Sequence, residues 1–84
     1  MATMATEKHN YEELNERQQA YVDALAEIRA KNLDESTELI QEGMEKQGFD
    51  AYSRSTVSTY KKLFGEIISK RKQMIANERI EHGL

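Results

Sequence analysis

The sequence contains no cysteine, no proline and no tryptophan, and only four glycines. Without cysteine it has neither a disulfide framework nor a thiolate metal site, which fits a reducing compartment. Since proline and glycine are the strongest helix breakers, their scarcity favours long helices. The two histidines, His9 and His82, lie near opposite ends of the sequence, so we expect no histidine-based metal or catalytic cluster.

Long apolar runs are missing as well. No stretch approaches the ~18 apolar residues of a membrane-spanning helix, and Met1–Asn10 lacks the apolar centre of a signal peptide. We therefore expect no membrane association and a cytoplasmic location, either with the nucleoid or inside an infected host cell. The 84 residues are rich in Ala, Glu, Lys, Gln and Leu, which predicts one small all-α domain over 10–84 after a flexible leader, 1–9.

The net charge of −3 is distributed unevenly. Residues 1–50 carry 12 acidic and 5 basic side chains, a net charge of −7, whereas residues 51–84 carry 3 acidic and 7 basic ones, a net charge of +4. Between residues 54 and 72, Glu66 is the sole acid among six basic residues: Arg54, Lys61, Lys62, Lys70, Arg71 and Lys72. A basic half favours a surface that faces a polyanion, although lysine-rich helices can also be simply solvated.

Helical periodicity predicts a first helix from a cap at Asn10 to about Ala30. Its other face, which includes Arg17 and Asp23, is expected to be solvated. Six apolar residues define its buried face: Tyr11, Leu14, Tyr21, Val22, Leu25 and Ile28.

A second helix is predicted after a cap at Asp34 or Ser36, and it ends at Gly48, which can adopt the left-handed conformation of a helix C-cap. Gly43 costs this helix about 1 kcal/mol of propensity relative to alanine. We expect it where two helices cross closely. The aromatic residues Phe49 and Tyr52 are expected to anchor the turn to the core, and the alternative is that they stack on bases.

The third helix is predicted to start at Ser53 or Ser55, and Leu63 is expected at the edge of its buried stripe. The residues of this stripe are Val57, Tyr60, Phe64, Ile67 and Ile68. Its opposite side carries small hydroxyls and basic residues, which let a helix lie deep in the major groove of DNA. These residues are Arg54, Ser55, Ser58, Thr59 and Lys62.

After Gly65 the pattern stays helical, either as one long arm or as a fourth helix that begins near Ser69. The expected fold is thus an all-α, three- to four-helix bundle that contains a helix-turn-helix with an extended turn. A single reading helix contacts few base pairs, so specific DNA binding favours a dimer. The candidate seam for a homodimer or another partner is apolar: Ile67, Ile68, Met74 and Ile75.

Residues 36–63 resemble the helix-turn-helix of winged-helix DNA-binding domains, and in particular the N-terminal domain of bacterial arginine repressors. Three segments carry the resemblance: Glu38-Leu39-Ile40, Gly48-Phe49 and Ser53-Arg54-Ser55-Thr56-Val57-Ser58. It implies that the third helix reads DNA bases. It does not extend to the amino-acid sensing of the arginine repressors. The winged type would continue with a two-stranded hairpin, but the helical periodicity of 65–84 predicts no strands there.

A second resemblance concerns the first predicted helix. Its opening is similar to that of phage small terminase subunits, in the segment Leu14-Asn15-Glu16-Arg17-Gln18-Gln19-Ala20-Tyr21-Val22. This similarity implies a phage or viral origin.

No nucleophile–base pair and no glycine-rich loop after a strand is present in the sequence, so we expect a non-enzyme without cofactor or metal. The first hypothesis is a small double-stranded DNA-binding protein, a transcriptional regulator or accessory factor. Its base contacts come from the third helix, and its phosphate contacts are Lys61, Lys70, Arg71 and Lys72. Together with Lys62 these residues would neutralise about five phosphates, which predicts a log–log salt slope of about −4 to −5. The alternative is a protein-interaction module or inhibitor that docks on a partner through its C-terminal helices, which the acidic first half favours.

Overall fold

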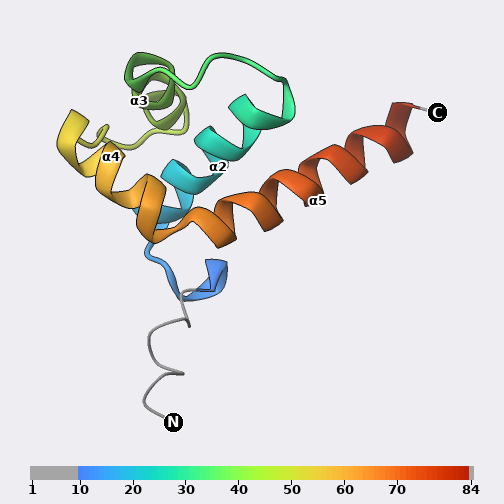
Figure 1. The fold of residues 1–84 in the computed structure, drawn as a ribbon, viewed down its shortest axis with the longest axis horizontal. Helices are drawn as coiled ribbons and strands as arrows, with labels where there is room; N and C mark the ends of the chain where they lie inside the picture. Colours follow the sequence, from blue (N-terminus) through green and yellow to red (C-terminus); the bar gives the residue numbers. More distant parts are fainter. Residues whose placement is uncertain (1–9, 84) are drawn as a thin grey trace, which may run out of the picture.

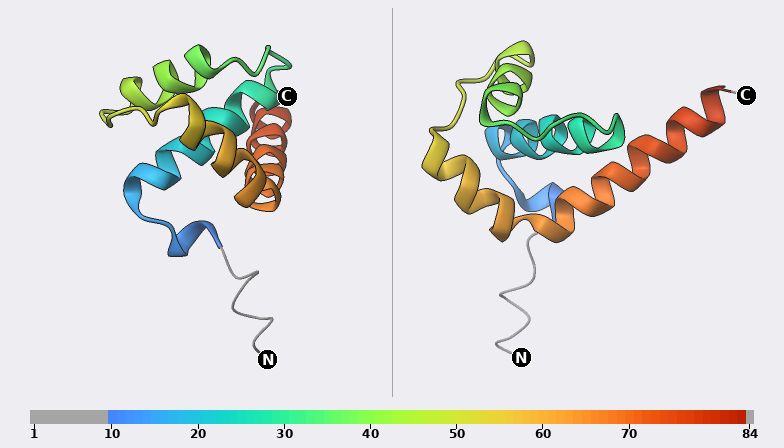
Figure 2. Two further views of the ribbon diagram at one scale, coloured as in Figure 1. Left: turned by 60° about the vertical axis from the view of Figure 1, so that its left-hand side comes forward. Right: turned by 45° about the horizontal axis from the view of Figure 1, so that its top comes forward.

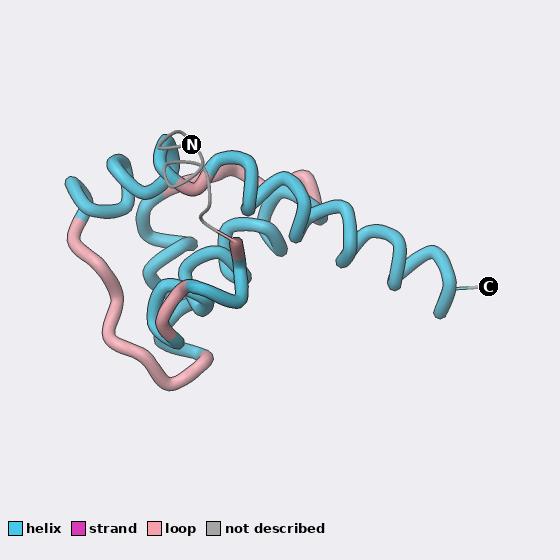
Figure 3. Tube along the Cα trace, turned by 90° about the horizontal axis from the view of Figure 1, so that it is seen from below, coloured by secondary structure: helices cyan, strands magenta, loops and turns pink. Residues whose placement is uncertain are grey.

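A computed structural model describes residues 10–83, with side chains over 10–77, so the predicted leader 1–9 lies outside the described residues. The described chain contains a short 3-10 helix, η1 (Tyr11–Glu13), and four α-helices: α2 (Glu16–Ala30), α3 (Thr37–Lys46), α4 (Arg54–Leu63) and α5 (Gly65–Gly83). Within 10–83 these helices are joined by loops and no strand occurs (Figure 3). The prediction of an all-α helical bundle is confirmed. None of the helices in the described range has the length and apolar character needed to cross a bilayer.

Helix α2 lies at the centre of the bundle, with α3 packed on one side and the first half of α5 on another (Figures 1 and 2). Because it has partners on two sides, α2 buries more of its circumference than the predicted stripe. The alanines Ala20, Ala24 and Ala26 are buried in addition to the predicted Tyr21, Val22, Leu25 and Ile28. Small side chains let the neighbouring helices approach closely. The buried face of α2 therefore includes these alanines as well as its large apolar residues.

The start of α2 differs from the prediction. Asn10 makes no capping hydrogen bond through its side chain, and the chain from Tyr11 to Glu13 forms η1 instead of a first α-helical turn. Leu14 then adopts an extended backbone, and Asn15 is the cap of α2. The Asn15 side chain accepts from the Gln18 amide at 2.8 Å, while the Gln18 side chain accepts from the Asn15 amide at 3.0 Å. This reciprocal capping box satisfies two backbone donors and outcompetes the cap at Asn10.

Both glycines of the predicted second helix have the expected structural roles. Ser36 caps α3 by accepting from the Leu39 amide. A Cβ placed on Gly43 would lie 2.8 Å from the Cβ of Ala24, so α3 packs on α2 there with no room for a side chain. Gly48 has a φ of +92° and ends the helix in the left-handed region, where a side chain is disfavoured.

Helix α4 runs almost directly into α5, and the two diverge as the arms of a V (Figure 2). Phe64 interrupts the helix with a φ of −104° and a ψ of 20°. From Gly65 onward α5 is one continuous helix, so no separate helix begins at Ser69. Its first half packs on α2, while its C-terminal half extends away from the body of the bundle (Figure 1). Of the two predicted alternatives the long arm is therefore present, and the chain bends before it, at Phe64.

Candidate nucleic-acid interface

The connection between α3 and α4, residues 47–53, is held in place by a side chain of α2. The guanidinium of Arg17 donates to the backbone carbonyls of Asp50 at 2.9 Å and of Ala51 at 3.2 Å. The same guanidinium lies 4.1 Å from the centre of the Tyr52 ring. Arg17 was expected on a solvated face, and its role in the structure is to fix the segment that leads into α4.

Four aromatic rings pack behind α4 and set its orientation. Ring centres are separated by 5.7 Å between Tyr21 and Tyr60 and by 5.0 Å between Tyr52 and Tyr60, both pairs edge to face. Phe64 lies 4.8 Å from Tyr60. The buried hydroxyl of Tyr21 also donates to the Val57 carbonyl at 2.7 Å. Edge-to-face packing of this kind contributes beyond area burial, so α4 is attached rigidly. The anchoring role predicted for Tyr52 is confirmed.

All five residues predicted to contact bases are exposed on the outer face of α4. Helical spacing of i, i+4 arranges this face in two rows. The first, which we call the cationic row, is Arg54, Ser58 and Lys62, and the second, the methyl row, is Ser55, Thr59 and Leu63. Ser53 caps the helix by accepting from the Thr56 amide at 3.4 Å, which decides between the two predicted caps.

Two carboxylates next to α4 partly neutralise its basic edge. Arg54 pairs with Glu38 of α3 at 3.3 Å, in a contact where both side chains are about three-quarters exposed (74% and 73%). Lys61 lies 3.7 Å from Glu35, which also receives two hydrogen bonds from Arg29, the shorter at 2.7 Å. The exposed Arg54 pair contributes little stability and exchanges readily with solvent. The Arg29–Glu35–Lys61 cluster is more enclosed and links α2, the loop before α3, and α4.

Lowering the pH is expected to weaken the Arg29–Glu35–Lys61 cluster. The hydrogen bonds from Arg29, together with the charge of Lys61, hold the pKa of the Glu35 carboxyl below its ordinary value, against the opposing effect of burial. A carboxyl group whose pKa is lowered by folding stabilises the folded protein at pH values above its ordinary pKa. This stabilisation is lost as the pH falls through the pKa of the folded state.

Urea unfolding of the native protein and of Glu35→Gln, at about pH 7 and at about pH 3.5, measures this contribution. The native protein should be more stable than the variant at the higher pH, and the difference should shrink at the lower pH. An unchanged difference would show that the carboxylate charge of Glu35 contributes nothing to the fold.

The residues predicted to contact phosphates lie in two separate places, one beside Glu35 and one beside η1. Lys61 belongs to the cluster around Glu35, and Lys72 lines a shallow depression beside Arg29 and Glu35. Lys70 lies on another side of α5, in a depression that it shares with Tyr11 and Met74.

Arg71 has a structural role. Its guanidinium is 2.7 Å from Asp23 and 4.2 Å from the centre of the Tyr11 ring, and the Tyr11 hydroxyl donates to the same carboxylate at 2.7 Å. Burial and this hydrogen bond raise the pKa of Tyr11 to about 12, so its hydroxyl stays protonated well above neutral pH. The three side chains tie η1 and α5 to α2, and we no longer count Arg71 among the phosphate contacts.

The seam predicted from α5 is corrected for two of its four residues. Ile67 and Ile68 are buried in the core, at 8% and 0% exposure, because they pack on α2 within the same chain. Ile75 is partly buried against the same core, and Met74 is half exposed. Met74 is thus the most accessible of the four.

The DNA contacts predicted from the sequence did not include two residues of this region, Leu63 and Glu38. Leu63, expected only at the edge of the buried stripe, is 51% exposed at the end of the methyl row. Glu38, noted only for a resemblance, is the carboxylate that faces Arg54. Helical periodicity alone indicates the exposure of Leu63, whereas the Glu38 contact depends on how α3 and α4 cross.

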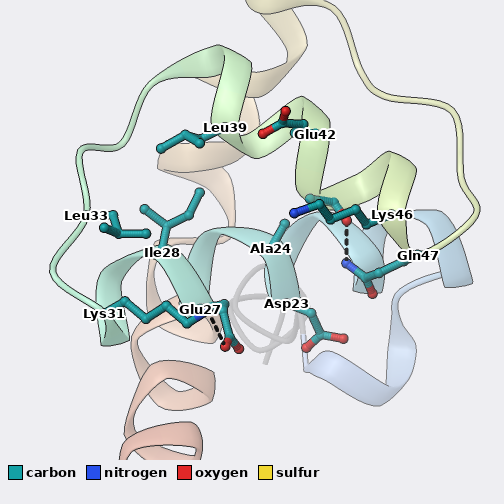
Figure 4. A pocket seen from close by; sticks show the side chains of 11 residues that line it. Asp23, Ala24, Glu27, Ile28, Lys31, Leu33, Leu39, Glu42, Lys46 and Gln47 are labelled. Atoms are coloured by element: carbon teal, nitrogen blue, oxygen red, sulfur yellow. Dashed lines mark hydrogen bonds and ion pairs between the residues drawn. The ribbon is translucent and has the colours of Figure 1, made fainter.

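A groove lies between α2 and α3, on a different part of the molecule (Figure 4). Its volume is about 390 Å³, and Ala24, Ile28 and Leu39 form an apolar floor. Charged side chains surround this floor, and two of them, Glu27 and Lys31, form an ion pair at 3.4 Å. The rim therefore carries both signs of charge.

The described residues therefore define a small all-α bundle in which a rigidly held helix presents an exposed hydroxyl-rich and basic face. No protein family, curated protein or solved structure matches this chain.

Proposed function

We propose that this protein binds double-stranded DNA by inserting the outer face of α4 into the major groove, as a transcriptional regulator or accessory factor. The observation that supports this most is the composition of that face. Its exposed positions hold Arg54, Ser55, Ser58, Thr59, Lys62 and Leu63. None of these six side chains is acidic, although acidic residues outnumber basic ones in the whole chain, 15 to 12.

The short side chains of α4 and the contacts that hold the helix in place support the same function. Hydroxyl side chains are short, so the helix backbone can approach base edges closely, and serine and threonine hydrogen-bond to any base. The Arg17 and Tyr21 contacts fix α4 before binding, so little conformational entropy is lost when DNA is bound. A DNA phosphate can replace the exposed Glu38 carboxylate as the partner of Arg54 at small cost, because such a surface pair is worth about 0.2–1 kcal/mol.

Replacing both Arg54 and Lys62 with alanine is expected to reduce DNA affinity by about ten-fold or more, because each removed cation loses a phosphate or guanine contact. Replacing Glu38 with glutamine is expected to raise affinity by about two- to five-fold, since it frees Arg54 and removes a negative charge close to the DNA backbone. Fluorescence anisotropy with a labelled mixed-sequence duplex measures both effects.

Helix content by circular dichroism serves as the folding control, and Lys46→Ala serves as the matched charge control. Lys46 is an exposed cation in the last turn of α3, on the rim of the α2–α3 groove and away from the α4 face. Its replacement should leave DNA affinity within about two-fold, as expected for a distant surface charge. An Arg54/Lys62 variant that binds as tightly as the native protein would contradict the proposal.

A second candidate function is docking on another protein through α5. The specific observation that favours it is the exposure of Met74 on α5, at 52%. In that case Met74→Glu should abolish the complex, while the Arg54/Lys62 variant should behave as the native protein. The two substitutions therefore separate DNA binding from docking.

A further inference from the structure

The outer face of α4 restricts which base pairs the helix can select. In the major groove Asn and Gln pair with adenine, Asp and Glu accept from cytosine, and Arg and Lys pair with guanine. Apolar groups contact the 5-methyl group of thymine. The six exposed positions of α4 hold two cations, three hydroxyls and one leucine, with neither an amide nor a carboxylate among them. Guanine and thymine are thus the bases for which this face has selective chemistry.

Contacts with guanine and phosphate do not explain why Leu63 is exposed on this face. Half of it is exposed, at 51%, although it follows two lysines at the end of a basic helix. Together with Ser58, Thr59 and Lys62 it lines a shallow depression on the outer face. Isolated exposed leucines are common on protein surfaces, but this one shares its depression with residues that the proposed function directs toward DNA.

The methyl row brings the apolar atoms of Thr59 and Leu63 together. The two residues are four positions apart, so their side chains lie one above the other on the helix. Their neighbours in the cationic row, Ser58 and Lys62, run alongside. An apolar strip next to a row that can bind guanine and phosphate matches the edge of a thymine-containing step, in which the 5-methyl group projects into the major groove.

We propose that α4 selects thymine-containing DNA through contacts of Thr59 and Leu63 with the 5-methyl groups. This inference rests on the proposed function, because it assumes that the outer face of α4 enters the major groove. Each buried methyl group is expected to increase affinity about four-fold. Ser55 and Ser58 hydrogen-bond without strong preference, so discrimination comes from the methyl contacts.

The test compares two duplexes that differ only in those methyl groups. One is an alternating adenine–thymine duplex, and the other has the same sequence with deoxyuridine in place of thymine. Anisotropy titrations at ~50 mM salt keep phosphate contacts strong in both. The native protein should bind the thymine duplex about 4- to 16-fold more tightly, for one or two methyl contacts. The double variant Thr59→Ser/Leu63→Ala should bind both duplexes equally, since it lacks the apolar atoms and keeps the cationic row.

The outcomes separate this inference from the proposed function. Equal affinity of the native protein for both duplexes would overturn thymine selection, while binding that still weakens with salt would leave the proposed function standing. A thymine preference that persists in the double variant would also overturn the inference, because it would arise from DNA shape. Failure to bind either duplex would overturn both. As an independent check, methylating the cytosines of a guanine–cytosine duplex at the same ring position should increase affinity.

Discussion

Replacing Ile68 with alanine is expected to lower the free energy of unfolding by about 2–5 kcal/mol, the usual cost of truncating a fully buried aliphatic side chain. Ile68 is 0% exposed and packs in the core between α5 and α2. The loss combines the removed apolar contacts with the cavity that remains. Urea unfolding followed by circular dichroism measures it.

Met74→Ala is the matched control, because Met74 lies on the same helix with half of its surface exposed. It should change stability by less than about 0.5 kcal/mol, as most surface substitutions do. A different pattern would contradict the fold. If Ile68→Ala left the protein as stable as before but changed its association state, Ile68 would belong to a seam between copies and not to the core.

Replacing Gly43 with alanine is expected to destabilise the protein by about 1–3 kcal/mol, the typical cost of overpacking. This result runs against helix propensity, which by itself favours alanine by about 1 kcal/mol. The reason is the crossing of α2 and α3, where the added Cβ would lie 2.8 Å from the Cβ of Ala24. The helices must separate, and the buried surface between them loses contacts.

Two control variants isolate the effect of the crossing. At Gly65 an added Cβ would meet nothing within 4 Å, so Gly65→Ala should be neutral or stabilising. The double variant Ala24→Gly/Gly43→Ala moves the methyl group from α2 to α3 and should recover part of the lost stability. If Gly43→Ala proved as stable as the native protein, the close contact between the two helices would be contradicted.

Local sequence signals predicted the helices and the exposed face of α4. The glycine at 48, the capping serines at 36 and 53, and the apolar spacing of Val57 and Phe64 act within one or two turns, so they are visible without tertiary structure. The same spacing correctly placed Arg54, Ser55, Ser58, Thr59 and Lys62 on one surface, and it placed Gly43 at a helix crossing.

What the sequence did not predict depends on residues that are far apart along the chain. Arg17 looked solvated, but its partners are backbone carbonyls more than 30 residues later. Arg71 looked available to DNA, but it pairs with Asp23, 48 residues earlier. Ile67 and Ile68 formed an apolar stripe that fits a dimer seam as well as an intramolecular core, and only the packing of α5 on α2 decides between them.

The corrected roles of the cations also change the expected salt dependence of DNA binding. Arg71 is engaged with Asp23 and Tyr11, Lys70 lies in a separate depression next to η1, and Lys72 lies on α5 beside Arg29. The cations that belong to α4 are Arg54, Lys61 and Lys62. With about three phosphates neutralised in place of five, the log–log slope becomes about −3.

The most direct test of DNA binding through α4 is the affinity for a mixed-sequence duplex, measured by fluorescence anisotropy at ~50 mM and ~200 mM salt. A slope of about −3 corresponds to a fall of about 40- to 60-fold across this range. If α4 binds DNA, the native protein should show this fall in affinity, and the Arg54/Lys62 variant should show a smaller one. Absence of binding at the lower salt, or an affinity that does not change with salt, would contradict it and would direct attention to a protein partner on α5.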